Sequence, residues 1–218
     1  MSRSTSTELT ENLREQVKKG VAVLKQGGVI AYPTDTVYGL GAGAFLTDAV
    51  KRIFKVKERP LNMPLPLLLA GVNQIDALTE TISTEARLLI DAFLPGALTL
   101  VLPAAESVPV IITAGGNTVA VRIPAHPVPL ALIEGLGTPI VGTSANLSGQ
   151  SSVLTADDVR MQIGDKIDFI IDGGKCPGGK ESTVVDVTGE NPVVLRAGAI
   201  PIEELRKICP DISLKEGN

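Results

Sequence analysis

The chain has 218 residues, a length that favours one large domain over two small ones. Its 44% hydrophobic and 20% charged residues are typical of a globular protein, and the 3% of aromatic residues predict a core of Val, Ile, Leu and Ala. A net charge of −4 at pH 7 disfavours a protein that holds nucleic acid by its overall field, so any bound phosphate should meet a local cluster of cations.

The chain is predicted to consist of a disordered tail over residues 1–8, one domain over 9–210 and a C-terminal tail over 211–218. The first tail is polar and lacks the apolar stretch of a signal peptide. No apolar run reaches the ~18 residues that span a bilayer. We therefore expect a cytoplasmic protein without membrane association.

Helices and strands are interleaved along the domain, as apolar periodicity and turn residues indicate. Helices are predicted over residues 11–26, after N-caps offered by Thr47 and Asp48, and over 83–93, 129–134, 155–163 and 202–208. Thr155 with Asp158 has the pattern of a capping box at the start of the helix over 155–163. Strands are predicted over residues 29–32, 65–70, 98–102, 118–123, 140–143, 169–172, 183–187 and 193–196. Several strands follow one another with only a turn between, which favours antiparallel pairs. The predicted fold class is therefore α+β with α/β-type layering, a twisted mixed parallel and antiparallel sheet flanked by helices.

Several common catalytic sites lack their parts in this sequence. No GxxxxGK[ST] loop is present, and the Gly-x-Gly pattern over residues 39–43 is not followed directly by a helix, as a dinucleotide fingerprint requires. His126, between Ala125 and Pro127, is the single histidine, so triads, zinc sites and histidine acid/base chemistry lack their usual parts and a structural role in a loop is favoured. Cys176 and Cys209 have neither metal-site spacing nor a disulfide framework, and we expect incidental thiols.

Polar segments at the ends of apolar strands carry the candidate chemistry. In residues 33–40 (PTDTVYGL), hydroxyls framed by proline and glycine suit a small polar ligand, although the same residues fit a turn that caps its own amides. Residues 51–60 (KRIFKVKERP) are the densest positive stretch. Cations at a helix C-terminus stabilise it by about 0.3–1 kcal/mol, but Lys57 and Arg59, predicted beyond the regular helix, also suit a polyphosphate.

Two further groups are candidates for binding an anion. The small residues of segment 141–149 (VGTSANLSG) allow backbone amides to approach a phosphate, and an irregular Asx-rich turn explains them equally well. Arg122, Ser182 and Arg196 interrupt or close apolar β runs. Arg122 is the sharper candidate of the two arginines, because an arginine buried among valines needs an anionic partner.

Taken in order, these segments resemble the YrdC-like threonylcarbamoyl-AMP synthase family, in its short, single-domain form. The matching motifs are residues 27–41 (GGVIAYPTDTVYGLG), 53–60 (IFKVKERP), 95–100 (PGALTL), 119–127 (VAVRIPAHP), 144–149 (SANLSG), 182–186 (STVVD) and 195–198 (LRAG). The resemblance covers roughly residues 10–208. It departs at Ala97 and Ala197, where members often have proline, and in residues 62–66 (NMPLP), an uncommon version of the loop after Arg59.

The resemblance implies a YrdC-like fold with a concave, positively charged cavity. It also implies a nucleotidyltransferase that makes threonylcarbamoyl-AMP and pyrophosphate from L-threonine, bicarbonate or CO2, and ATP. The product would serve N6-threonylcarbamoyladenosine (t6A) at position 37 of tRNA. Mg2+ is expected to bind mainly through the ATP phosphates, without metal ligands from the chain. Catalysis would come from positioning two anions and neutralising their charge.

The resemblance also assigns site residues. The threonine site is assigned to Thr34, Arg122, Gly142 and Ser182, with Arg122 pairing the carboxylate. The ATP site is assigned to Lys57, Arg59, Leu61, Thr118, Ser144, Asn146, Ser152 and Arg196. Lys57 and Arg59 are expected to be the catalytic cations.

Two alternatives stay open. The first is a double-stranded RNA-binding module, since the cavity of this fold can attract such RNA; the net charge of −4 and the few aromatic residues disfavour it. The second is a paralogue with the same fold and another activity. For the synthase itself, we expect a monomer that hands its product transiently to a tRNA threonylcarbamoyltransferase complex.

Overall fold

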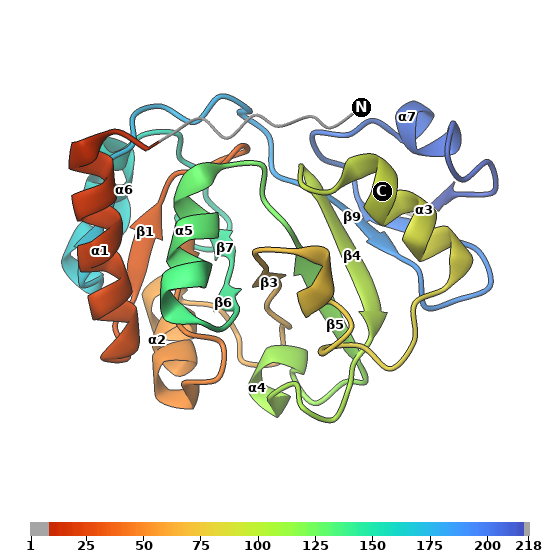
Figure 1. The fold of residues 1–218 in the computed structure, drawn as a ribbon, viewed down its shortest axis with the longest axis horizontal. Coiled ribbons are helices and arrows are strands. Elements are labelled where there is room, and N and C mark those ends of the chain that lie inside the picture. Colours follow the sequence, from red (N-terminus) through yellow and green to blue (C-terminus); the bar gives the residue numbers. More distant parts are fainter. Residues whose placement is uncertain (1–8, 216–218) are drawn as a thin grey trace.

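The computed structural model describes residues 9–215. Its strands form two mixed β-sheets, which are called the four-stranded and the seven-stranded ladder below (Figure 1). The four-stranded ladder has the order β7 (Thr143–Ser144), β2 (Gly39–Gly41), β1 (Ile30–Tyr32) and β8 (Phe169–Ile170). The seven-stranded ladder has the order β11 (Ser213–Leu214), β10 (Val193–Arg196), β9 (Thr183–Asp186), β4 (Leu98–Pro103), β5 (Thr118–Arg122), β3 (Leu67–Leu68) and β6 (Ile140–Val141). Each ladder contains parallel and antiparallel pairs. The predicted mixed sheet is thus confirmed, but it is divided into two ladders.

One short segment belongs to both ladders. β6 pairs antiparallel with β3, and β7, which follows it directly, pairs antiparallel with β2. Gly142 lies between them, and its N–H donates to the Pro66 carbonyl at 2.9 Å. A Cβ at this position would lie only 2.3 Å from Leu68 Cγ, so any larger residue would displace Leu68, which explains the glycine at this position. The single strand predicted over residues 140–143 is therefore two strands at a junction.

Helices flank both ladders, as predicted. α1 (Glu11–Lys25) packs on α5 (Pro127–Leu136), and α1, α5 and α6 (Ala156–Ile163) lie beside β1 at the left of Figure 1. The other helices are α2 (Thr47–Lys57), α3 (Thr84–Phe93), α4 (Val110–Thr113) and α7 (Ile202–Arg206), with short 3-10 turns η1 (Val72–Gln74) and η2 (Gly164–Lys166). α3 and α7 lie beside β4 and β9, at the right of Figure 1.

The predicted helix caps are confirmed at α6 and wrong at α2. The Thr155 hydroxyl accepts from the Asp158 N–H at 3.2 Å, which satisfies one of the free donors of the first turn of α6. α2 begins at Thr47 after Leu46 and has no side-chain cap, so neither Thr47 nor Asp48 caps it. α2 also continues to Lys57, which corrects the prediction that this lysine lies beyond the regular helix.

Three elements were not predicted from the sequence: α4, β2 and β11. The residues of β2, Gly39–Gly41, have low strand propensity and were predicted as part of a turn. β11 pairs in parallel with β10, so Ser213 and Leu214 belong to the sheet rather than to the tail predicted from residue 211. Residues 1–8 and 216–218 of the two predicted tails lie outside the described residues.

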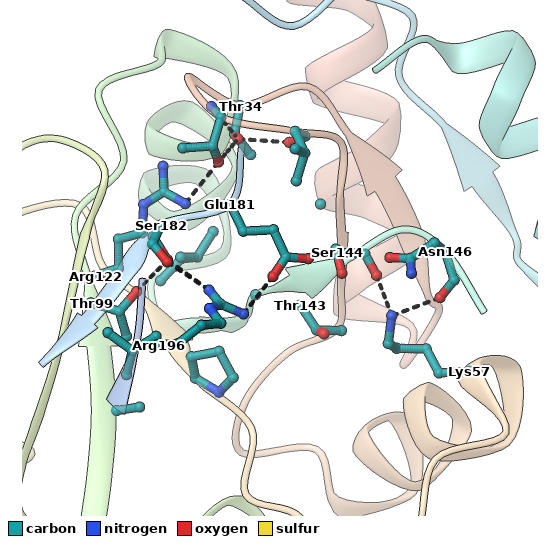
Figure 2. Close-up of a pocket in the computed structure, with 18 of the residues that line it drawn as sticks. Thr34, Lys57, Thr99, Arg122, Thr143, Ser144, Asn146, Glu181, Ser182 and Arg196 are labelled. Carbon is teal, nitrogen blue, oxygen red and sulfur yellow. Dashed lines mark hydrogen bonds and ion pairs between the residues drawn. The ribbon is translucent and has the colours of Figure 1, made fainter. Parts of the chain in front are cut away.

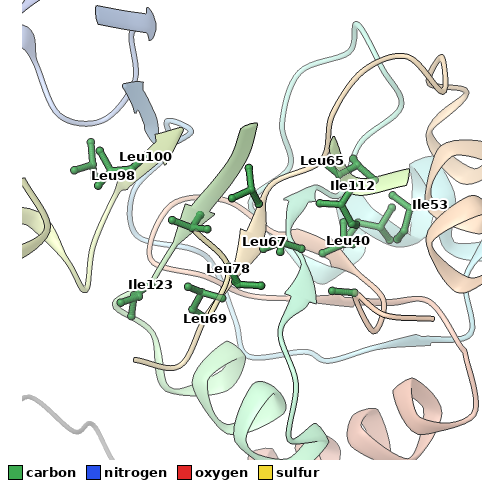
Figure 3. Close-up of a cluster of buried hydrophobic side chains, with 14 of the residues drawn as sticks. Leu40, Ile53, Leu65, Leu67, Leu69, Leu78, Leu98, Leu100, Ile112 and Ile123 are labelled. Atoms are coloured by element: carbon green, nitrogen blue, oxygen red, sulfur yellow. The ribbon is translucent and has the colours of Figure 1, made fainter. Parts of the chain in front are cut away.

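The core consists mainly of Leu, Ile, Val and Ala, as the composition predicts. Figure 3 shows the largest cluster, in which Leu40, Ile53 and Ile112 lie close together between the strands and the neighbouring helices. A second cluster under α1 and α5 contains Tyr32, whose buried hydroxyl donates to the Val141 carbonyl at 3.3 Å. Among the described residues, none of the helices has the length and apolarity needed to cross a membrane.

Candidate active site

A cavity of about 510 Å³ lies where residues of both ladders meet, a volume typical of a small-ligand site. Its walls come from the β1–β2 turn, the α2–β3 loop, strands β4, β5, β9 and β10, and the segment after β6 (Figure 2). The predicted site residues that line it are Thr34, Lys57, Arg59, Arg122, Gly142, Ser144, Asn146, Ser182 and Arg196. Residues more than 150 positions apart in the sequence are thus brought to one cavity.

The charges that line the cavity are unequal. Among the described residues, the lining contains four cationic side chains, those of Lys57, Arg59, Arg122 and Arg196, and one carboxylate, that of Glu181. Asp35, which pairs with Arg122, lies outside this lining. In an acidic protein this concentration of cations favours an anionic ligand, because the low dielectric of a cavity strengthens the attraction.

Arg122, at the end of β5, is 7% exposed and is bound on three sides. Its Nη2 contacts Asp35 Oδ1 at 2.6 Å, its Nη1 donates to Thr36 Oγ1 at 3.0 Å and its Nε donates to the Gly96 carbonyl at 2.9 Å. The anionic partner that a buried arginine requires is therefore Asp35. Because a guanidinium carries five N–H groups, two remain for a ligand.

The hydroxyl groups of the β1–β2 turn bind one another and the backbone. Thr34 Oγ1 donates to the Val37 carbonyl at 2.7 Å and accepts from the Thr36 N–H at 3.0 Å. The Thr34 N–H in turn contacts Cys176 Sγ at 3.4 Å. The Thr34 hydroxyl thus donates its hydrogen bond within the turn, which agrees with the self-capping alternative. Thr34 lines the cavity, but this donor is not free for a ligand.

Lys57 is 2% exposed and holds the segment after β7. Its Nζ donates to the Asn146 carbonyl at 2.7 Å and to the Ser144 carbonyl. Burial and the nearby Arg59 lower the pKa of Lys57 to about 8, although the charge of Glu181 opposes this shift. Two of the three ammonium donors are engaged by carbonyls, which leaves one for a ligand.

Two buried polar atoms at the cavity have no hydrogen-bond partner among the described residues: Arg59 Nε and Asn146 Oδ1. Burial and the nearby Arg196 lower the pKa of Arg59. The Asn146 amide donates to the carbonyls of Leu147 and Gln150, at 2.9 and 2.7 Å, so its Oδ1 is the free acceptor. Buried polar atoms are rarely left unpaired, and these two indicate that a ligand with both donors and acceptors belongs here.

Glu181 lies at the centre of the cavity and was not predicted from the sequence. Figure 2 shows its carboxylate between Arg196 on one side and Ser144 on the other. It pairs with Arg196 and accepts from Ser152 Oγ at 2.6 Å. Burial would raise the pKa of Glu181, but hydrogen bonds from Ser152 and Ser144 and the charges of Arg196 and Lys57 outweigh it and lower the pKa. The one sequence signal was its place directly before Ser182 in the ESTVVD stretch.

Ser182 is held between strands. Its hydroxyl lies 2.8 Å from Thr99 Oγ1 on β4, and its carbonyl accepts from Arg196 Nη2 at 2.8 Å. Gly198 allows the two segments to approach, because a Cβ there would lie 2.4 Å from the backbone of Ser182.

Leu61, Thr118 and Ser152 are predicted site residues outside the lining of the cavity. Leu61 is 62% exposed in the α2–β3 loop, where Met63, Pro64 and Pro66 form the wall instead. Thr118 begins β5, whose Ala120 and Arg122 line the cavity. Ser152 reaches the cavity only through its hydrogen bond to Glu181.

His126 has a structural role at a helix N-terminus, and the two cysteines are buried. His126 precedes α5, where its Nδ1 accepts from the Val128 N–H at 3.2 Å and caps the helix. Cys176 and Cys209 are both buried and free. Within residues 9–215, no group of three or more His, Cys, Asp or Glu side chains gathers as a metal site.

Known proteins are similar in sequence to this chain. The profile of the Sua5/YciO/YrdC family, described as telomere recombination, matches residues 22–198. The threonylcarbamoyl-AMP synthase of Pyrococcus abyssi is 45% identical over 208 residues, which cover 93% of this chain and 61% of that protein. The threonylcarbamoyl-AMP synthase of Coxiella burnetii is 34% identical over 181 residues, which cover 83% of this chain and 97% of that protein.

The fold is shared as well. The crystal structure of P. abyssi Sua5 complexed with L-threonine has a TM-score of 0.91 and 45% sequence identity, over 95% of this chain and 61% of that one. The present chain therefore spans about three fifths of the length of this relative. From the profile match over most of the chain, the level of identity and the common fold, we conclude that the chain belongs to the Sua5/YciO/YrdC family.

Proposed function

We propose that this chain is an L-threonylcarbamoyladenylate synthase, which forms threonylcarbamoyl-AMP and pyrophosphate from L-threonine, bicarbonate or CO2, and ATP. The product would be used to make t6A at position 37 of tRNA. The observation that carries the proposal is the cavity itself, whose lining brings together four cationic side chains from three segments and one carboxylate. Such a cavity suits two anionic substrates held side by side.

For threonine, the proposed partners are Arg122, Ser182, Thr34 and the backbone of Gly142, all of which line the cavity. The two free N–H groups of Arg122 would receive the carboxylate while Asp35 keeps the guanidinium oriented. With the carboxylate held, the neutral amino nitrogen adds to CO2 and loses a proton to solvent, which gives a carbamate. A carbamate oxygen then attacks the α-phosphorus of ATP while the bond to the α,β-bridging oxygen breaks, and pyrophosphate leaves. The chain supplies orientation and charge for this step, and no covalent intermediate is needed.

For ATP, the proposed partners are Lys57, Arg59, Leu61, Thr118, Ser144, Asn146, Ser152 and Arg196. The free N–H of Lys57 and the unpartnered Nε of Arg59 would donate to the phosphates and neutralise the charge that develops on pyrophosphate. We expect Mg2+ to accompany ATP and to lower the negative charge of the phosphates. As the resemblance implies, its ligands would be mainly phosphates and water; the Glu181 carboxylate and the free Asn146 Oδ1 are the oxygens in the lining that this hard cation would meet.

The deciding experiment is pyrophosphate release from ATP by the purified chain with Mg2+. We expect release that requires both threonine and bicarbonate. Release that needs neither would indicate another activity of the same fold, and no release in any combination would remove the synthase proposal. A gel shift with double-stranded RNA at several salt concentrations addresses the RNA-binding alternative.

The affinity for ATP is expected to depend on the charge of Lys57. Its pKa of about 8 means that the ammonium loses its proton above that pH, so ATP affinity should fall by up to about tenfold per pH unit between pH 8 and 9.5. Titration calorimetry over this range checks the prediction. In K57M, the affinity for ATP should not fall over this pH range. If the affinity of K57M fell with pH as that of the wild type does, another group would be responsible.

The lowered pKa of Lys57 also determines how the free energy of unfolding changes with pH. In the folded chain the pKa of Lys57 lies below the ordinary lysine value of 10.5, so the unfolded chain binds this proton more tightly. The contribution of Lys57 to the free energy of unfolding is therefore fully present above pH 10.5 and is lost as the pH falls to about 8.

The proposed partners follow from the reaction. The adenylate is an activated mixed anhydride, so we expect direct, transient transfer to a tRNA threonylcarbamoyltransferase complex. A monomer in the cytoplasm is the state we propose. Size-exclusion chromatography with light scattering, with and without that complex, measures both the oligomeric state and the docking.

A further inference from the structure

Glu181 is the one carboxylate in the lining of the cavity among the described residues. The reaction proposed above gives it no chemical step, yet it is placed among the groups assigned to ATP. It pairs with Arg196, beside which it lies in Figure 2, and accepts a hydrogen bond from Ser152. Its negative charge also raises the pKa values of Lys57 and Arg59 against the effect of burial. A carboxylate at the centre of a polyphosphate site needs an explanation, because it repels the ligand.

Before a ligand binds, this carboxylate compensates the neighbouring cations. Arg59 and Arg196 repel each other, as do Arg59 and Lys57, and Glu181 opposes both repulsions. Its second partner, Ser152, holds it in place from outside the lining. Glu181 therefore keeps like charges together in a region that water screens poorly.

The balance changes when a polyphosphate enters. The phosphates compensate the cations better than one carboxylate does, and the carboxylate then faces negative charge at close range. A divalent cation on the phosphates removes two of those charges and gives the carboxylate a partner. Without the cation, Glu181 opposes binding.

Building on the ATP site proposed above, we propose that Glu181 makes the cavity selective for ATP complexed with a divalent cation over metal-free ATP. Glu181 is here a specificity-determining residue that acts on the charge of the bound nucleotide. The carboxylate penalises the free nucleotide, and the same carboxylate is compensated when the metal complex binds.

The test is the affinity for α,β-methylene-ATP, measured by titration calorimetry with Mg2+ and with EDTA. The quantity of interest is the ratio of the two dissociation constants, since a general loss of structure would weaken both forms alike. We expect the wild-type chain to bind the Mg2+ form more tightly. In E181Q the preference should fall roughly tenfold, mainly because metal-free nucleotide binds better.

Three variants make the result specific. E181D keeps the charge and should keep the preference, whereas E181S is a second neutral variant with the same expected loss should E181Q fold poorly. E190Q removes an exposed carboxylate from the β9–β10 turn and should behave as wild type. An unchanged ratio in folded E181Q and E181S would overturn the assignment. A wild-type chain that binds neither form would instead overturn the ATP site, and the role of Glu181 with it.

Discussion

Replacing Arg122 by alanine is expected to lower kcat/KM for threonine in pyrophosphate release by about 10²–10³-fold, with little change in the dissociation constant for ATP. The guanidinium lies at the cavity with two free N–H groups, and a carboxylate bound there would make charge-assisted hydrogen bonds out of bulk water. Pyrophosphate release at varied threonine, with ATP affinity measured separately, checks this expectation. Wild-type threonine kinetics in a folded R122A chain would contradict it.

The same substitution should also destabilise the fold. Asp35, with a side chain 15% exposed, would lose its cation, and breaking a buried pair on one side costs about 3–5 kcal/mol. The double variant R122A/D35N should recover part of this free energy of unfolding without recovering activity. R160A is a matched control, because Arg160 pairs with Asp157 and Asp172 at the surface, where an ion pair contributes less than about 1 kcal/mol. Urea denaturation of the four chains separates the binding role from the structural one.

Replacing Lys57 by methionine is expected to raise the dissociation constant for ATP by about 10²-fold. The methionine keeps the apolar stem, but it removes the donor that binds the Ser144 and Asn146 carbonyls and the charge that would face the phosphates. Titration calorimetry and pyrophosphate release measure the effect. K55A is the control on the same helix, since Lys55 is exposed and should tolerate the change.

A contrary result at Lys57 is easily recognised. If K57M bound ATP as wild type does but unfolded at a lower denaturant concentration, Lys57 would be a structural clamp of the 144–146 segment alone. If both affinity and stability fell, the two roles would coincide in one side chain.

The local elements follow from local sequence. The apolar spacing of α1, Ser83 before α3 and the Thr155 cap of α6 predict these helices, because helix geometry and capping involve residues three or four positions apart. The resemblance to known motifs also indicated where the candidate site lies, since nine of the twelve residues that it assigned line the cavity.

Some predictions were wrong because sequence patterns are weak guides to the ends of helices and to short strands. Lys57 was predicted beyond α2, but the helix continues until Glu58, which ends it in a left-handed conformation with φ of 54°. β2 consists of Gly-Leu-Gly and has little strand propensity, so only its pairing with β1 and β7 makes it a strand.

The sequence by itself determined the mixed α and β composition, the positions of most helices and most of the segments that reach the cavity. Only the tertiary structure decided how the sheet divides at Gly142 and which group partners each buried charge. Asp35 and Arg122 are 87 positions apart, so nothing local in either segment identifies the pair. The role of Glu181 is of the same kind, because its surroundings come from α2, the segment after β7 and β10. Pairings between distant segments depend on the whole fold, and the charges of this cavity are arranged almost entirely by such pairings.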